Sequence, residues 1–181
     1  SAVGHYFNPV NFAVEGLPEE KVEYLARLGM NQIVLIDLGY WPHSKLHTYV
    51  KSEVFDFQPP PVPEMRTKLL AASALCVKHG IEPYLWLEEP VLPEIAGQVD
   101  QYPAEAIGYA KRPWGGDSEG ISPTLCVSSR IVQDHYRQLM RKFVREYPDI
   151  KGVVFYNLDG SSWLCTQSLC ENCGRQAEAL S

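Results

Sequence analysis

The sequence predicts an α/β protein in which strands and helices alternate about four times along the chain. The first observation behind this prediction is a series of continuous apolar runs of strand length, of which residues 33–36 are the clearest. The second is that segments with apolar residues three or four positions apart lie between these runs. The third is that Gly or Pro stands between each helical segment and the next strand. Strands that are apolar on both faces are typical of a parallel sheet covered by helices.

The first helix is expected over residues 18–28. Pro18 suits its first turn, and Gly29 ends it. The strand that follows is expected over residues 32–37. A short first strand over residues 3–7 would precede the helix.

A second helix is expected over residues 63–79, because its apolar side chains recur on one face. Gly80 ends this helix, and a strand over residues 82–87 follows. A third helix begins after Ser128 or Ser129, either of which can cap its first turn.

Pro148 ends the third helix, and a fourth apolar strand is expected over residues 152–156. A last helix is expected over residues 168–180. Successive strand–helix units are joined by right-handed crossovers, so the strands are expected to form one parallel sheet.

Two architectures accommodate these repeats. A doubly wound open sheet would be complete at 181 residues, whereas a (β/α)8 barrel usually needs about 250 residues, so only its first half would be present. The connections that follow strands, residues 39–62 and 88–128, are long, and long structured loops usually carry function. No GxGxxG or GxxxxGK[ST] phosphate loop follows a strand, which weakens the nucleotide-binding alternative. We therefore predict a single (β/α)4-type domain over residues 1–181, a partial (half) TIM barrel.

The composition narrows the function classes. The hydrophobic fraction of 45% is enough for one core. A net charge of -6 leaves no basic surplus for phosphates, which argues against nucleic-acid binding. The longest apolar runs are strand-length, so no membrane span is expected, and the first residues do not read as a signal peptide. The compartment stays open. A half barrel leaves sheet edges open, so we expect the remainder of a barrel or a partner subunit to cover them.

Polar side chains stand at the carboxyl ends of the clearest strands. Asp37 follows one strand, Glu88 and Glu89 follow the next, and Asn157 and Asp159 follow the last. Because parallel strands open on one face, these side chains are expected to converge on one mouth. Glycosidic bond cleavage needs one carboxyl group to protonate the leaving oxygen and another to attack or stabilise the anomeric carbon. We predict Asp159 with Glu88 or Glu89 as the catalytic carboxylates, and Asp37 and Asn157 as substrate-binding residues. The alternative is that such acids cap helices or are solvated.

Aromatic side chains accompany these acids, as expected for a site that binds the apolar faces of sugars. The predicted binding residues are Trp41, Trp86, Trp163 and Tyr6, with His5 at the first strand. None of the four tryptophans lies in a predicted helix, which core filling would not explain. The alternative is that the rings wedge the long loops onto the rim of the sheet.

The five cysteines contain the most motif-like pattern, Cys165-x4-Cys170-x2-Cys173. Structural zinc takes four tetrahedral ligands, and Cys126 is the natural fourth because it ends the preceding loop. The same spacing begins plant-type [2Fe–2S] ferredoxins, but no fourth cysteine follows here. The remaining alternative is reduced, packed thiols or one disulfide with spare thiols. Cys76 lies on a helix face and is expected in the core.

Three segments carry a resemblance: residues 24–31 (YLARLGMN), 125–128 (LCVS) and 148–153 (PDIKGV). They resemble glycoside-hydrolase TIM barrels, most of all family 20 β-hexosaminidase-like and α-glucuronidase-like catalytic domains. The resemblance implies an acidic site residue after the last strand and a Cys-x-x-Cys-like pair beyond it, positions held here by Asp159 and by Cys170 and Cys173. Family 20 enzymes carry an adjacent Asp-Glu pair at the fourth strand, whereas this chain has Asp159-Gly160.

The leading hypothesis is therefore a carbohydrate-active domain, a glycoside hydrolase that uses strand-end carboxylates and tryptophan stacking. The alternative is a non-catalytic partial barrel with a structural zinc site that binds glycans or assembles with another subunit. A third hypothesis is an iron–sulfur redox protein.

Overall fold

A computed structural model describes residues 9–12, 16–37, 45–90, 99–111, 121–155, 165, 170, 172 and 173. The chain divides into two compact units. The first, here the sheet unit, comprises Ser1–Lys51, Pro60–Leu87 and Arg141–Phe155. The second, the hairpin unit, comprises Ser52–Pro59, Glu88–Met140 and Tyr156–Ser181. Whether the whole chain acts as a single domain stays a prediction.

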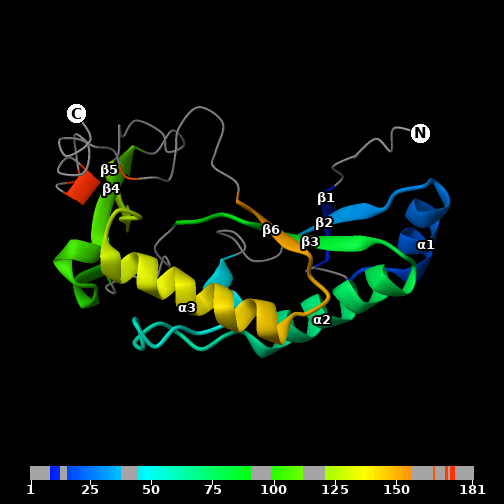
Figure 1. Cartoon of the computed structure of the whole chain (residues 1–181), viewed down its shortest axis with the longest axis horizontal. Helices are drawn as coiled ribbons and strands as arrows, with labels where there is room; N and C mark the ends of the chain where they lie inside the picture. Colours follow the sequence, from blue (N-terminus) through cyan, green and yellow to red (C-terminus); the bar gives the residue numbers. More distant parts are fainter. Residues whose placement is uncertain are drawn as a thin grey trace. The chain divides into compact units, whose positions relative to one another are not determined.

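The sheet unit is built on four parallel strands (Figure 1): β1 (Pro9–Asn11), β2 (Gln32–Ile36), β3 (Glu82–Leu87) and β6 (Gly152–Phe155). Their order in the sheet, β1-β2-β3-β6, is also their order along the chain. A doubly wound sheet reverses its strand order at a switch point, whereas a barrel adds each strand beside the previous one. The order thus agrees with the predicted α/β half-barrel architecture.

The helices of the sheet unit follow the predicted boundaries closely. α1 (Glu19–Arg27) lies between β1 and β2 in the chain, and α2 (Pro63–Lys78) lies between β2 and β3. α1 buries Val22 and Leu25, and α2 buries the face that includes Leu69 and Cys76. Gly29 and Gly80, which follow these helices, have φ of 81° and 73°, a left-handed conformation that glycine adopts without steric cost. These two helices and the strands after them confirm the predicted repeats.

A cluster of interactions holds the segment after β2 in the sheet unit. The carbonyl oxygen of Tyr49 accepts hydrogen bonds from Arg66 at 3.0 Å and from the Tyr147 hydroxyl at 3.2 Å. The Tyr49 ring makes edge contacts with Phe143 and Tyr147. Arg66 also pairs with Glu146 at 2.8 Å. Within the predicted loop over residues 39–62, Tyr49 is therefore fixed by packing against Phe143 and Tyr147 at the end of the third helix.

That third helix, α3 (Arg130–Glu146), begins directly after Ser129 and ends before Pro148, as predicted. The division between the two units falls within it, after Met140. The first strand found in the described part is Pro9–Asn11, and the expected strand over residues 3–7 lies outside that part. The expected helix over residues 168–180 also lies outside it, apart from three residues.

The hairpin unit contains elements that the sequence did not predict. Within the expected loop over residues 88–128, β4 (Ile107–Lys111) pairs antiparallel with β5 (Ile121–Leu125). Two short 3-10 helices, Val99–Gln101 and Ala104–Ala106, precede the hairpin. Gly108 and Pro123 interrupt the two strand patterns, because glycine and proline are depleted in strands. In its described part, the segment therefore contains two short 3-10 helices and a pair of antiparallel strands.

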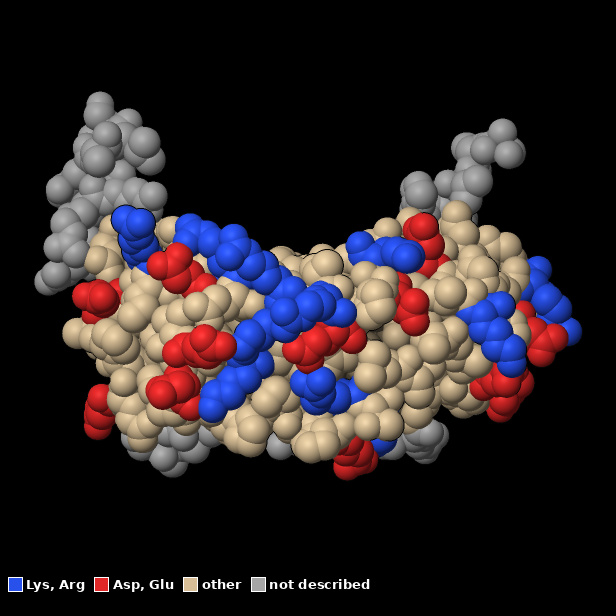
Figure 2. Space-filling view, turned by 60° about the horizontal axis from the view of Figure 1, so that its bottom comes forward, with Lys and Arg blue, Asp and Glu red and all other residues tan. Residues whose placement is uncertain are grey.

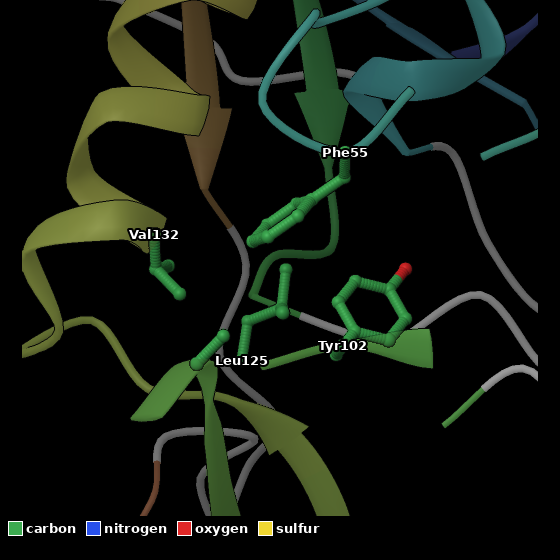
Figure 3. Packing of buried hydrophobic residues seen from close by; sticks show 5 residues of the cluster. Phe55, Tyr102, Leu125 and Val132 are labelled. Carbon is green, nitrogen blue, oxygen red and sulfur yellow. The ribbon is translucent and has the colours of Figure 1, made fainter. Parts of the chain in front are cut away.

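An aromatic cluster packs the core of the hairpin unit. It consists of Phe55, Tyr102, Ala106, Leu125 and Val132. Figure 3 shows four of these side chains directed toward one another from β5, α3 and the segments before them. The rings of Phe55 and Tyr102 meet edge to face with their centroids 5.0 Å apart, a favoured aromatic geometry.

Charged side chains of both signs cover the surface. On the face shown in Figure 2, Lys and Arg are mixed with Asp and Glu. Exposed ion pairs such as Lys78 with Glu19 belong to this mixture. Among the helices of the described ranges, none combines the length and apolar character needed to cross a bilayer.

Candidate metal centre and strand-end carboxylates

Four cysteines from two distant parts of the chain meet in the hairpin unit. They are Cys126, Cys165, Cys170 and Cys173, and their Sγ atoms all lie within 4.8 Å of one another. Cys126 follows β5 directly, so the hairpin supplies one thiol and the later segment supplies three. Cys126 is fully buried, and Cys170 and Cys173 are nearly so. The predicted set of four sulfur atoms is thus brought together in one place.

The spacing of the sulfur atoms matches that of ligands around a single ion. Cys126 Sγ lies 3.4 Å from Cys170 Sγ and 3.7 Å from Cys173 Sγ. Cys165 Sγ lies 3.0 Å from Cys173 Sγ. Four thiolates around one tetrahedral zinc ion, each about 2.3 Å from it, would lie about 3.8 Å apart. A disulfide would need about 2.05 Å, and none of the five cysteines, all within the described part, forms one.

Two backbone N–H groups point at these sulfur atoms. The N–H of Ser128 donates to Cys126 Sγ, and the N–H of Cys173 donates to Cys170 Sγ. Such bonds favour the thiolate, which is the form that binds a metal. For Cys126, burial and the neighbouring Cys170 thiol outweigh this effect and raise the pKa to about 11. For Cys170, burial is opposed by the Cys173 N–H and by the other three thiols, and the pKa is lowered. Cys170 is therefore the thiol of this pair that more readily takes the thiolate form, and a bound cation would favour the thiolate form of all four cysteines.

Further hydrogen bonds tie both cysteine segments to the 3-10 helix Ala104–Ala106, which precedes β4. The N–H of Cys126 donates to the carbonyl oxygen of Ala106 at 2.9 Å, and the Asn172 side chain donates to the carbonyl oxygen of Glu105 at 2.8 Å. Cys173 Sγ and Ser128 Oγ lie 3.4 Å apart. The four sulfur atoms thus sit in a framework of backbone bonds, as expected for a closed structural site.

Cys76 takes no part in this cluster. It is fully buried on α2 in the sheet unit, and burial raises the pKa of its thiol to about 12. The core position predicted for it is confirmed.

The strand-end carboxylates are buried where they are described. Asp37, which follows β2, is 2% exposed, and Glu88 and Glu89, which follow β3, are 7% and 6% exposed. Burial of three acidic side chains is costly unless polar partners compensate, so such residues mark structural or functional positions. Asp159 and Asn157 lie outside the described residues.

Glu89 has a partner that sequence reasoning did not anticipate. The Tyr136 hydroxyl on α3 donates to Glu89 Oε2 at 2.6 Å within the hairpin unit. Burial and the negative charge of Glu89 raise the pKa of Tyr136 well above its usual value. In the sequence, Tyr136 lies within the expected third helix at apolar spacing with Val132 and Leu139, so nothing in the pattern identified it as a polar partner.

Of the aromatic residues predicted to bind a ligand, Trp86 alone is described. It lies on β3, where it pairs with Val154 of β6 and is partly buried. Tyr84 lies two residues before it, on the same face of the strand. Trp41, Trp163, Tyr6 and His5 lie outside the described residues.

Comparison of the sequence with protein-family models finds no match, and comparison with curated proteins finds none either. Solved structures do match. A candidate alpha-amylase from Salmonella typhimurium is similar with a TM-score of 0.54 and 15% identity, over 84% of this chain and 26% of that one. The alpha-galactosidase from Lactobacillus brevis is similar with a TM-score of 0.53 and 15% identity, over 90% of this chain and 22% of that one.

These likenesses bear on the fold. The chain spans about a quarter of the length of each of these two solved structures, 26% and 22%. The two structures are named as enzymes that cleave glycosidic bonds, and they match the α/β fold predicted from the sequence. The finer resemblance to family 20 and α-glucuronidase-like domains is not tested by them and stays a prediction.

Proposed function

We propose that the chain is a carbohydrate-active domain, the first half of a glycoside-hydrolase-type barrel. The observation that carries this proposal is the sheet unit itself. Its parallel strands are neighbours in chain order, and Asp37, the acid that directly follows β2, is buried. The buried Glu88 and Glu89 directly follow β3 and belong to the hairpin unit. In parallel barrels the site is built at the carboxyl ends of the strands. The similarity of fold to two glycosidases supports the same reading.

The carboxylates divide the work of bond cleavage in this proposal. Asp159 and one glutamate after β3 act as the acid and the nucleophile or stabiliser. The Tyr136 hydroxyl donates to Glu89 Oε2, and either Glu88 or Glu89 takes the second role. Asp37 and Asn157 bind hydroxyl groups, and Trp86, Trp163, Trp41, Tyr6 and His5 contact the sugar. The rest of the barrel, in the same protein or a partner subunit, completes the site.

A substitution at Glu88 tests the catalytic role. The chain, alone and in its native assembly, is assayed with a panel of α- and β-linked aryl glycosides. Glu88→Gln and Asp159→Asn are each expected to lower kcat by about 10²–10⁴-fold, the contribution of a positioned acid or base. Glu82→Gln is the matched control, because Glu82 is an exposed acid at the opposite end of the same strand. Unchanged turnover in Glu88→Gln would remove Glu88 from the mechanism.

The alternative is a non-catalytic partial barrel that binds glycans or assembles with a subunit. Native mass spectrometry together with the aryl glycoside assay distinguishes the enzyme from the binding module. An assembly that hydrolyses aryl glycosides supports the enzyme, whereas a stable monomer that binds glycans without cleaving them supports the binding module.

We propose in addition that the four-cysteine cluster holds one structural zinc ion. Four thiolates leave no open coordination position, so the ion would join the hairpin to the later cysteine segment rather than perform chemistry. In a [2Fe–2S] cluster the thiolates divide between two irons, which fits four sulfur atoms within 4.8 Å of one another less well.

Elemental analysis of the purified chain tests the zinc proposal. We expect one zinc per chain, and loss of that zinc in Cys126→Ser. The matched control is Cys76→Ser, which alters a buried cysteine that belongs to the sheet unit and takes no part in the cluster. Iron with inorganic sulfide, or a chain that takes up no zinc, would overturn the assignment.

A further inference from the structure

Gly108 of β4 lies against the cysteine cluster. It is buried and pairs with Thr124 of β5. A Cβ atom at this position would lie 2.5 Å from Cys165 Cβ, 3.0 Å from Cys165 Sγ and 3.3 Å from Cys126 Cβ. Cys165 can therefore approach β4 this closely only because Gly108 has no side chain.

Any side chain at position 108 would clash sterically with the Cβ atom of Cys165. Two carbon atoms in contact normally lie about 3.5–4.0 Å apart, so a methyl group at this position would displace Cys165 by about 1 Å. The Cβ atom of Cys165 is attached to the backbone and cannot rotate away, so the chain itself would move. Metal–ligand distances in a formed site hold to within about 0.2 Å, which is several-fold less than that displacement.

The backbone conformation of Gly108 does not itself demand glycine. Gly16, Gly29 and Gly80 have positive φ, whereas Gly108 lies in a regular antiparallel pair outside the left-handed region. Alanine would therefore fit the strand, and the effect of adding a methyl group reports on the contact with Cys165.

We infer that Gly108 is a positioning residue of the metal centre: its missing side chain admits Cys165 to the fourth coordination position. The inference rests on the proposed zinc site and assigns a role to a residue that cannot itself bind the ion. In this inference the hairpin contributes to the site in two ways. Cys126 directly follows β5, and Gly108 of β4 determines the position of Cys165, a ligand from a later segment of the chain.

Metal binding by Gly108→Ala tests this role. Zinc affinity of the full chain is measured by competition with a chromophoric chelator, and Co²⁺ substitution reports the number of thiolates around the ion. We expect zinc binding about 10–100-fold weaker than in the wild type, as when the support of a ligand is lost. We also expect a weaker thiolate-to-Co²⁺ absorption band, because Cys165 no longer coordinates. Tyr109→Ala is the control, since Tyr109 is the next residue of β4 and is exposed.

A double-mutant cycle keeps the test decisive if Gly108→Ala folds poorly. Cys165→Gly removes both atoms that a methyl group would meet at 3.0 Å or less. In a chain that already carries Cys165→Gly, the further change Gly108→Ala should therefore lower the zinc affinity only slightly. The effects of the two substitutions on zinc affinity are then expected to be strongly non-additive.

The outcomes separate this inference from the zinc proposal. A wild-type chain that takes up no metal overturns both. A wild type with a four-thiolate site, together with a Gly108→Ala variant of unchanged affinity and Co²⁺ spectrum, overturns only the role of Gly108. Equal losses from Gly108→Ala in the presence and absence of the Cys165 side chain would also overturn it.

Discussion

In the sheet unit the buried side chains are aliphatic and aromatic residues of regularly spaced strands and helices, whereas the hairpin unit combines a small hydrophobic cluster with four sulfur atoms. The sheet unit buries Ile33, Leu35, Leu85 and Leu87 on its strands. The hairpin unit has the smaller cluster around Phe55 and, in addition, the four cysteines. Aliphatic burial is spread over many small contacts, while a metal site concentrates its stabilisation in a few bonds. The two units should therefore respond differently to the same kind of damage.

Removal of the metal should have the largest effect, and only in the hairpin unit. Structural zinc in small domains contributes on the order of 10 kcal/mol of folding free energy at neutral pH. If the cluster holds zinc, chelation should abolish hydrogen-exchange protection in β4 and β5 while β3 remains protected. The measurement is native-state exchange of the zinc-loaded and chelated chain, resolved by peptide. Equal loss of protection in β3 would mean that the two units unfold as one.

A cavity in the core of the sheet unit should have the next largest effect on stability. This effect should be confined to the sheet unit, whereas metal removal should affect the hairpin unit. Leu85 is fully buried in β3, and Leu85→Ala should lower the free energy of unfolding by about 2–5 kcal/mol. The loss should be the same with and without metal. Val144→Ala is the control, because Val144 is 64% exposed and its removal creates no cavity. A Leu85→Ala effect that depends on zinc would contradict the separation of the two cores.

The same contrast explains what the sequence could predict. Continuous apolar strands and glycine-ended helices gave the boundaries of α1, α2 and β3 to within two residues, because their periodicity is local. The β4–β5 hairpin depends on pairing between separate segments, and Gly108 and Pro123 weaken its local pattern. The hairpin is therefore absent from the elements predicted by local pattern, and one of the two residues that weaken this pattern is the glycine inferred to position Cys165.

Some residues of the candidate site were also predictable from the sequence, and others were not. The four cysteines were predicted together because metal sites have a recognisable ligand spacing and number. The contact between Tyr136 and Glu89 could not be predicted, since it joins a helix face to a strand end through a tertiary contact. Gly108 had no signal either, because its role lies in the space that it leaves. Sequence patterns thus identify ligands more readily than the residues that position them.

Acid should weaken the hairpin unit through a buried histidine. His135 is 2% exposed beside the ring of Phe55, and burial lowers its pKa to about 4. The unfolded chain, in which the pKa is about 6.5, takes up a proton that the folded chain excludes, so stability is lost as the pH falls from about 6.5 to about 4. The expected loss is up to about 3 kcal/mol. Urea unfolding across this range measures it, and His135→Leu should remove most of the slope. A slope that persists in His135→Leu would assign the acid sensitivity to other groups.

The smallest effect expected is from Tyr136→Phe, which separates structure from catalysis at the two adjacent glutamates. The variant removes the hydroxyl that donates to Glu89 Oε2, and a hydrogen bond to a charged group contributes about 1.5–3 kcal/mol. The free energy of unfolding should fall by that amount, since phenylalanine keeps the ring packing of Tyr136. If Glu88 is the working acid, turnover of an aryl glycoside should stay within about twofold of the wild type, because the lost bond supports stability rather than proton transfer. A large loss of kcat with little loss of stability would instead place Glu89 in the mechanism, held in position by Tyr136.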